Sequence, residues 1–171
     1  VLTQLPFELS NEILAQAVAE AQMTGRFQLL GEQDFAKFSQ NRPLAQVIID
    51  VGHNPHAARY LADCLTEWVQ PHRKIYAVFS ALVDKDLSGI VEPLEHLIDE
   101  WHCAGLQGYR GQSSEKVKTK LLATLPNADV TAYENVAKAS QSLFEKATNR
   151  DVILVFGSFH TVADFLIWLE Q

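Results

Sequence analysis

The sequence predicts an α/β fold: a Rossmann-like three-layer domain with a mostly parallel sheet of about six strands flanked by helices. Short, continuously apolar runs alternate along the chain with longer segments whose apolar residues recur at helical spacing. Runs such as VILVF at 152–156 are apolar at every position, so both of their faces must be covered, as in a parallel sheet. The 171 residues contain no internal repeat and no linker rich in Pro, Gly or Ser, which indicates one compact domain.

The first elements are a helix and a pair of extended segments. Ser10 is suited to cap a helix that ends before Thr24 and Gly25. The segments RFQLL at 26–30 and DFAKF at 34–38 follow, separated by the turn-like GEQ. We interpret them as a hairpin or an extended pair.

Five stronger strand candidates come next, and each is followed by a predicted helix. The strands are QVIID at 46–50, KIYAVF at 74–79, EWHCA at 100–104, DVTAY at 129–133 and DVILVF at 151–156. The helices carry apolar stripes at Ala57, Leu61, Cys64, Leu65 and Trp68; at Leu87, Ile90, Val91, Leu94 and Ile98; at Val117, Leu121 and Leu125, behind the predicted cap Ser114; at Val136, Leu143, Phe144 and Ala147; and at Val162, Phe165, Leu166 and Leu169.

Composition and charge exclude several classes of partner. The net charge is −7 and no Lys/Arg cluster offsets the acidic excess, which argues against a broad nucleic-acid or anionic-membrane surface. The two cysteines, Cys64 and Cys103, are too few for a disulfide scaffold and lack metal-type spacing. With no membrane-spanning run and no secretion-type N-terminus, we expect a cytoplasmic protein.

Three loops that follow predicted strands hold groups that can act on a ligand. These loops are DVGHNP at 50–55, SALVDKD at 80–86 and GSFHT at 157–161. Ligands of open α/β sheets bind beyond the carboxyl ends of the strands, which is where these loops are expected. Asp50 is suited to accept hydrogen bonds from ribose hydroxyls, and the N–H groups from Asn54 onward are suited to an anion.

Structural explanations compete with these functional ones. Asn54 and Pro55 are ordinary helix-capping and first-turn residues, whereas Asp50 fits either a ligand or a structural cap. His53 and His56 are three residues apart without a third ligand, so no metal site is predicted. Ser158 precedes His160 by two residues but lacks the Gly-x-Ser-x-Gly pattern of hydrolases. The sequence also contains neither a phosphate loop nor the Gly-x-Gly-x-x-Gly fingerprint.

Four stretches in the right order carry a family resemblance. MTGRFQLL, IIDVGHNPHAA, VDKD and VFGSFHTVADFL resemble the C-terminal domain of the bacterial bifunctional dihydrofolate synthase/folylpolyglutamate synthase family, in the Mur ligase superfamily. The resemblance runs from about Pro6 to the end of the chain. It implies that 1–24 are an N-terminal helix and linker from a preceding ATPase domain and that 25–171 form a Mur-ligase-type C-terminal domain. The start at Val1 agrees with a processed chain or a piece of a longer one.

The resemblance implies an ATP-dependent amide ligase that adds L-glutamate to dihydropteroate, to folylpolyglutamate, or to both. ATP phosphorylates the acceptor's carboxylate, and the amine of L-glutamate attacks the acyl phosphate. The N-terminal ATPase domain of the same polypeptide would bind most of the ATP and Mg²⁺. This chain alone is therefore expected to be inactive, and the protein to be a monomer.

The resemblance also implies roles for individual residues. Arg26 matches an inter-domain arginine that reaches the γ-phosphate region and aids phosphoryl transfer. Asp50 matches the acid that binds the ATP ribose, and His53 matches a motif histidine near the nucleotide or the incoming glutamate. Ser158 and His160 match the loop that binds the glutamate carboxylate. No residue of this chain is assigned as a metal ligand.

Two departures from the family pattern bear on these roles. The family more often has Ala where Gly52 stands, and Gly-Met where this chain has Ser80 and Ala81.

Two alternatives to the folate ligase stay open: a non-catalytic nucleotide-binding module, and a Mur-type ligase domain with another acceptor.

Overall fold

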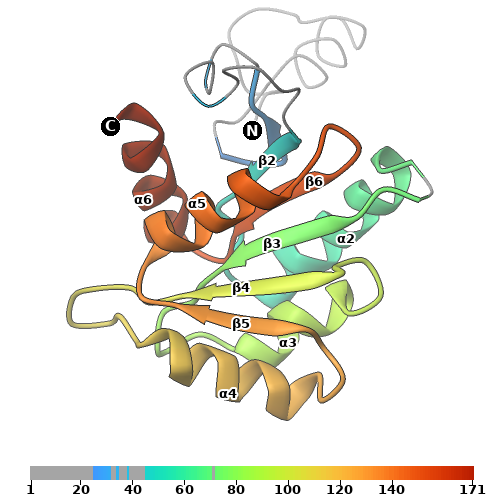
Figure 1. Ribbon diagram of the computed structural model, residues 1–171. Coiled ribbons are helices and arrows are strands. Elements are labelled where there is room, and N and C mark those ends of the chain that lie inside the picture. Colours follow the sequence, from blue (N-terminus) through green and yellow to red (C-terminus); the bar gives the residue numbers. More distant parts are fainter. Residues whose placement is uncertain (1–24, 32–33, 35–37, 39–44, 71) are drawn as a thin grey trace, which may run out of the picture.

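The computed structural model describes residues 25–31, 34, 38, 45–70 and 72–171. Within these residues, six strands form one sheet in the order β1-β2-β6-β3-β4-β5 (Figure 1). All neighbouring strands are parallel except β1, which is antiparallel to β2. The strands are β1 (Gln28–Leu29), β2 (Gln46–Asp50), β3 (Ile75–Phe79), β4 (Glu100–Ala104), β5 (Val130–Tyr133) and β6 (Val152–Phe156); the helices are α2 (Pro55–Trp68), α3 (Leu87–Val91), η3 (Glu92–Leu94), α4 (Ser114–Thr124), α5 (Val136–Lys146) and α6 (Phe159–Glu170).

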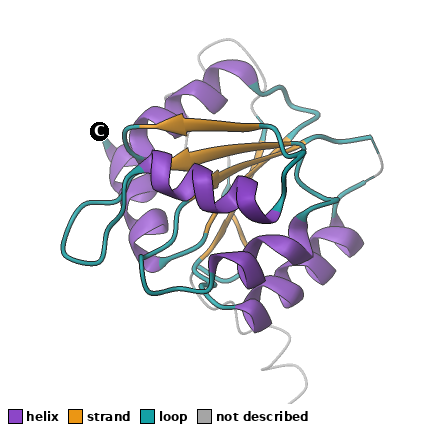
Figure 2. Cartoon of the chain, turned by 90° about the horizontal axis from the view of Figure 1, so that it is seen from below, coloured by secondary structure: helices purple, strands orange, loops and turns teal. Residues whose placement is uncertain are grey.

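Helices cover both faces of the sheet (Figure 2). Helices α2, α3 and α4 pack on one face and α5 and α6 on the other. The residues of strand β6 are all apolar because both of its faces are buried. Val152, Leu154 and Phe156 pack in the core on the α2, α3 and α4 side, while Ile153 and Val155 pack in the core on the α5 and α6 side. The alternation of side chains along a strand sends neighbours into opposite layers, so a strand buried on both faces has no polar side.

The register of the parallel strands brings their carboxyl ends to one edge. Asp50 of β2 and Phe79 of β3 both pair with Phe156 of β6, and Phe79 also pairs with Cys103 of β4. The loops that follow these four strands therefore emerge side by side, at the left of Figure 1. This edge is where the sequence places its candidate ligand-binding loops.

The expected three-layer fold and five main strands are confirmed. Residues 26–30 contain the short strand β1, which pairs with β2; the predicted pairing of this segment with 34–38 stays a prediction. Most of 34–38 and the predicted helix behind Ser10 lie outside the described residues. No helix in the described part of the chain is long and apolar enough to cross a membrane.

The apolar stripes predicted for the helices are buried, but one helix end, one N-cap and the burial of Cys64 differ from the prediction. Helix α3 ends at Val91 and continues as a 3-10 turn that contains Pro93, which cannot donate a helical hydrogen bond. The N-cap of α4 is Ser113, one residue before the predicted Ser114. Cys64 is only half-buried, because α2 turns Ala58, Leu61, Ala62 and Leu65 toward the sheet.

His102 on β4 is a buried histidine. It is 3% exposed, its ring stacks on Tyr133 at 5.0 Å, and Nδ1 has no hydrogen-bond partner among the described residues. Nε2 lies 3.7 Å from Glu100, which also pairs with Lys146. Burial lowers the pKa of His102, and the nearby carboxylates of Glu100 and Asp129 oppose that shift only partly.

We predict that this histidine makes the fold sensitive to mild acid. Because the folded pKa is lowered, the unfolded chain takes up the proton first, and stability falls as the pH drops below about 6.5. His102→Phe should flatten the decline in unfolding free energy between about pH 7 and pH 5, measured by urea unfolding. The exposed His96→Asn should leave the wild-type decline in place; equal slopes for wild type and His102→Phe would contradict the prediction.

Candidate functional site

The topology predicts a ligand site around the carboxyl end of β6. After β6 the chain passes to α6 on one face, whereas after its neighbours β2 and β3 it passes to α2 and α3 on the other face. Adjacent strands whose connections leave toward opposite faces open a crevice between their loops. The loops after β2, β3 and β6 therefore flank the most suitable position for a ligand.

Asp50 ends β2 at this edge and is 4% exposed. Its Oδ1 accepts a hydrogen bond from Gly52 N at 2.6 Å, and its Oδ2 accepts one from Phe27 N at 2.9 Å. Burial raises the pKa of the Asp50 carboxyl, although the two N–H groups and the charge of Arg26 act in the opposite direction. One carboxylate thus joins the end of β2, the loop that leads to α2 and the segment before β1.

That segment presents Arg26 at the edge. The Arg26 side chain is exposed, while Gly25 before it is buried and accepts a hydrogen bond from Val51 N at 2.7 Å. A short strand antiparallel to β2 is what carries residues 25–27 to the carboxyl end of β2. Arg26 and Asp50 are 24 positions apart in sequence yet belong to one corner of the site.

The loop after β2 holds His53 in a defined orientation. His53 Nδ1 lies 3.0 Å from the carbonyl oxygen of Val51, which can only accept, so Nδ1 carries the proton and Nε2 is the nitrogen that can meet a ligand. The ring lies 5.9 Å from that of Phe159 at the start of α6. Asn54 Oδ1 accepts from Ala57 N at 2.9 Å, which confirms its role as a helix cap.

Gly52 fits where a larger residue would collide. A Cβ on Gly52 would lie 2.6 Å from Asp50 Oδ1 and 2.9 Å from the Cβ of Ala57. A side chain at this position would therefore require the Asp50 carboxylate to shift from its present contact with Gly52 N.

Ser158 and His160 lie at the start of α6 but differ in exposure. Ser158 is 2% exposed and caps the helix: its Oγ accepts from Thr161 N at 3.0 Å and contacts Thr161 Oγ1 at 2.8 Å. Thr161 Oγ1 in turn donates to the carbonyl of Ser80 at 3.2 Å, which joins the loops after β6 and β3. His160 is exposed, so it and the first N–H groups of α6 are the parts of this loop that a ligand can reach.

The sequence did not predict the hydrogen bonds that join the loops after β3 and β4. Arg110 Nε and Nη2 bond to Asp84 Oδ1 and Oδ2 at 3.0 and 2.5 Å, and Val83 N donates to the carbonyl of Arg110 at 3.0 Å. The guanidinium lowers the pKa of Asp84, and Asp84 raises the pKa of Arg110. The partners lie 26 residues apart, and no local pattern could have paired them. Lys85 lies 3.8 Å from Asp84.

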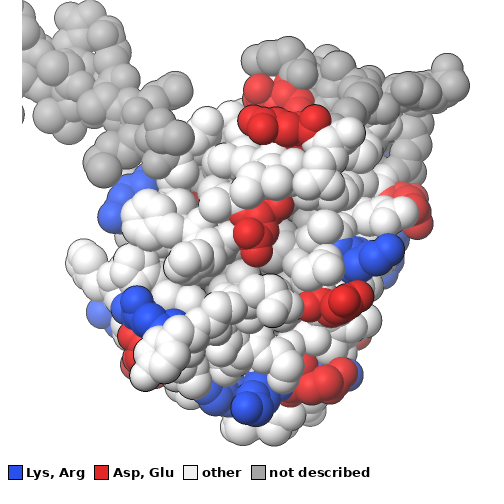
Figure 3. Space-filling view, turned by 90° about the vertical axis from the view of Figure 1, so that its left-hand side faces the viewer, with Lys and Arg blue, Asp and Glu red and all other residues white. Residues whose placement is uncertain are grey.

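The surface around this edge is mixed in charge. Figure 3 shows acidic and basic side chains interspersed with uncharged ones on the side of the molecule that lies at the left in Figure 1. The part of this face that the structure describes shows no broad basic patch. An anion must therefore be held by local groups such as Arg26 and helix N-termini.

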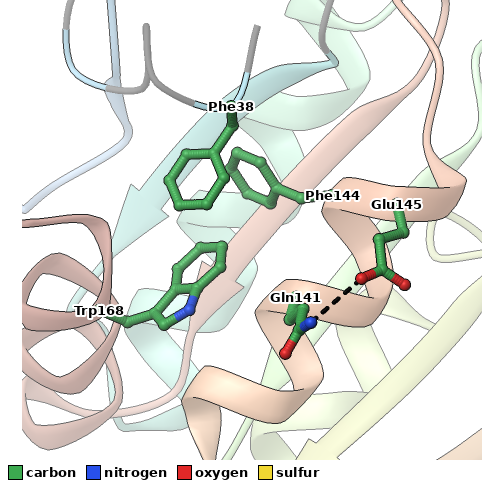
Figure 4. Close-up of a pocket in the computed structure, with 5 residues that line it drawn as sticks. All are labelled: Phe38, Gln141, Phe144, Glu145 and Trp168. Atoms are coloured by element: carbon green, nitrogen blue, oxygen red, sulfur yellow. Dashed lines mark hydrogen bonds between the residues drawn. The ribbon is translucent and has the colours of Figure 1, made fainter. Parts of the chain in front are cut away.

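A separate hollow lies near the C-terminal ends of α5 and α6. It has a volume of about 590 Å³ and is lined by Phe38, Gln141, Phe144, Glu145 and Trp168 (Figure 4). Gln141 Nε2 donates to Glu145 Oε1 at 3.1 Å. Because α5 and α6 run back from the carboxyl edge, their last turns are remote from Asp50 and His53, so this hollow is not part of the candidate site.

Comparisons with known proteins show the family to which the chain belongs. Residues 25–159 match the family model described as Mur ligase, glutamate ligase domain. The chain is 41% identical over 172 residues to the dihydrofolate synthase/folylpolyglutamate synthase of Haemophilus influenzae, an alignment that covers 97% of this chain and 39% of that protein. The chain thus spans well under half the length of this relative.

Two solved structures are similar over nearly the whole chain. One is a bifunctional folylpolyglutamate synthase/dihydrofolate synthase with Mn, AMPPNP and L-glutamate bound: 37% identity, a TM-score of 0.77, and coverage of 100% of this chain and 37% of that one. The other is the Escherichia coli protein in complex with DHPP and ADP, at 33% identity and a TM-score of 0.78, covering 96% of this chain and 36% of that one.

We predict that Asp50 stabilises the fold as well as the site. Asp50→Ala leaves the N–H groups of Phe27 and Gly52 without an acceptor, and each such group costs about 1–3 kcal/mol when buried. The unfolding free energy should fall by about 2 kcal/mol or more, measured by urea titration. The exposed cap variant Asp86→Ala, which removes one bond to Gly89 N, should cost only about 1 kcal/mol. Equal losses would argue against this role.

A second prediction concerns Ser80, whose buried hydroxyl has no hydrogen-bond partner among the described residues. Ser80→Ala should raise the unfolding free energy by about 1 kcal/mol, because it removes an unpaired polar group without opening a large cavity. The equally buried Ser140 donates to the carbonyl of Val136, so Ser140→Ala should instead lower stability by about 1 kcal/mol. Thermal unfolding of both variants tests the contrast, and a loss of stability in Ser80→Ala would contradict it.

Proposed function

The chain belongs to the Mur ligase, glutamate ligase domain family, and on this premise we propose that it is the C-terminal domain of an ATP-dependent ligase that adds L-glutamate to dihydropteroate, to folylpolyglutamate, or to both. In this proposal residues 25–171 form the domain, and 1–24 are a helix and linker from a preceding ATPase domain. The observation that carries it is the convergence of the Arg26 segment and the His53 loop on Asp50, beside the start of α6. The bound AMPPNP and L-glutamate in a similar structure support it.

The reaction proceeds in two steps. The acceptor's carboxylate attacks the γ-phosphorus of ATP, so that an acyl phosphate forms and ADP leaves. The amine of L-glutamate then attacks the acyl carbon, and inorganic phosphate departs as the amide forms. Each step moves negative charge, which positioned cationic groups and N–H dipoles can stabilise.

The residues at the edge fit these steps. Arg26 is exposed and its guanidinium can contact the γ-phosphoryl group while charge shifts during transfer. Asp50 uses one lone pair on each oxygen for a backbone N–H, and the remaining lone pairs can accept from a ribose hydroxyl. His53 offers Nε2 toward the nucleotide or the incoming glutamate.

The glutamate carboxylate fits the start of α6. Because the Ser158 hydroxyl is engaged by Thr161, we assign contact with the carboxylate to His160 and to the first N–H groups of the helix, with Ser158 shaping the turn. The positive end of the helix dipole favours an anion at this position.

Other parts of the proposal concern what lies outside this chain. Among the described residues, no group of three or more His, Cys, Asp or Glu side chains is arranged to hold a metal ion. We therefore place the Mg²⁺ ligands in the N-terminal ATPase domain of the full-length polypeptide, where the ion would neutralise phosphate charge when bound. We also propose that the full-length protein is a cytoplasmic monomer and that this chain alone is inactive.

The test is phosphate release by the full-length polypeptide with ATP, Mg²⁺, L-glutamate and 7,8-dihydropteroate, with each omitted in turn. Release should require L-glutamate together with either the pteroate or a folylpolyglutamate supplied in its place. Release with glutamate but another acceptor would indicate a different Mur-type ligase, and nucleotide binding without release would indicate a non-catalytic module; either result would overturn the proposal.

Arg26→Ala should lower kcat by at least about 100-fold, because a charge-stabilising group is lost, and Arg26→Lys should recover part of that loss. Arg150→Ala is the matched control, since Arg150 is exposed in the turn before β6, at the other end of the sheet. It should leave kcat within about twofold. A similar loss in both variants would remove Arg26 from the proposed site.

A further inference from the structure

The turn that presents Arg26 is held at its first residue by a side chain without an assigned role. Gly25 N donates to Gln28 Oε1 at 2.7 Å, and the Gly25 carbonyl accepts from Val51 N at 2.7 Å. Both backbone polar groups of the residue before Arg26 are therefore fixed. Gly25 adopts a φ of 75°, and a Cβ there would lie 2.9 Å from Val51 Cγ1, so this close approach depends on glycine.

The residue after Arg26 is held in a strained conformation. Phe27 has a φ of 40°, which is unfavourable for a residue with a side chain. It persists because Phe27 N donates to Asp50 Oδ2 and because the ring packs edge-on against Trp68 at 6.0 Å. A turn under strain relaxes when one of its supports is removed, and Arg26 lies between two such supports.

Gln28 supplies the support that belongs to the turn itself. Its backbone pairs with Ile49 in the two-residue strand β1, and its side chain folds back to Gly25 across Arg26. A two-residue strand makes few backbone hydrogen bonds that could fix the conformation of the turn before it. The side-chain hydrogen bond of Gln28 therefore closes the turn. Because the Arg26 side chain is exposed, the direction in which it points depends on the backbone of this turn.

We propose that Gln28 is a positioning residue: its side-chain oxygen holds the Gly25–Gln28 turn in the geometry that directs Arg26 toward the transferred phosphoryl group. This inference rests on the proposed ligase function. Gln28 acts through Arg26 and does not itself touch the substrate.

The test is a double-mutant cycle in the full-length polypeptide. Gln28→Met keeps the length of the side chain but removes the acceptor, and Gln28→Glu keeps an acceptor oxygen. Gln28→Met should lower kcat about tenfold through misplacement of the arginine, with the KM for L-glutamate within about twofold. In an Arg26→Ala background the same change should alter kcat by less than about twofold. Gln28→Glu should retain most of the wild-type kcat, and Gln141→Met, on the exposed side of α5, is the control for the exchange of Gln for Met.

Amide hydrogen exchange gives a readout that does not depend on activity. In the full-length protein, the amides of Gly25 to Gln28 should exchange faster in Gln28→Met than in wild type or in Arg26→Ala. An equal kcat loss in both Arg26 backgrounds, a Gln28→Glu variant as slow as Gln28→Met, an Arg26→Ala variant with wild-type kcat, or unchanged exchange would each overturn the inference. A wild-type protein without glutamate-dependent phosphate release would refute the proposed function, and the exchange data would still decide whether Gln28 holds the turn.

Discussion

The hydrogen bonds of the buried Asp50 carboxylate are the interaction on which the candidate site depends. A carboxylate at the end of a strand buried on both faces needs partners, and here it finds two backbone N–H groups from segments that approach from different sides. Phe27 brings the Arg26 turn and Gly52 brings the His53 loop. The same oxygen atoms that satisfy a buried charge therefore fix the distance between two candidate functional side chains.

This arrangement carries an electrostatic cost that argues for a role beyond folding. The pKa of Asp50 is raised because desolvation outweighs the two N–H bonds and the charge of Arg26. A folded-state pKa above the unfolded one means that the ionised form is less favourable in the native protein than in the unfolded chain, so near neutral pH this group lowers stability relative to an unshifted carboxyl. Two further unfavourable features are the positive φ of Phe27 and the Ser80 hydroxyl, which has no hydrogen-bond partner in the described part of the chain. Such local costs gather at functional sites, where geometry matters more than stability.

The sequence was sufficient for the elements but not for how they meet. QVIID and DVILVF could be assigned as buried strands because their apolar runs have no polar face, and Asn54 could be assigned as a cap because of the Pro55 that follows it. The insertion of β6 between β2 and β3 is not encoded in any local pattern, since it depends on which crossover passes over which face. The pairing of β1 with β2 and the Arg110–Asp84 contact likewise join segments more than 15 residues apart. The resemblance could assign candidate roles, but it could not show that Ser158 caps α6 or that Gln28 Oε1 accepts a hydrogen bond from Gly25 N.

The position of β6 also explains why the proposed chemistry needs more than this chain. With connections to α2 and α3 on one side and to α6 on the other, the sheet offers an edge where Arg26 and His160 are exposed. An acyl phosphate reacts with water, so an enzyme that forms it must cover the reacting atoms once substrates are bound. Exposed groups on a rigid sheet edge can align a nucleotide and an amino acid, but they do not exclude solvent. A second body that closes over this edge would supply the missing enclosure, and the fixed spacing between Arg26, Asp50 and His53 would let that closure bring prearranged groups into contact with the phosphates in one movement.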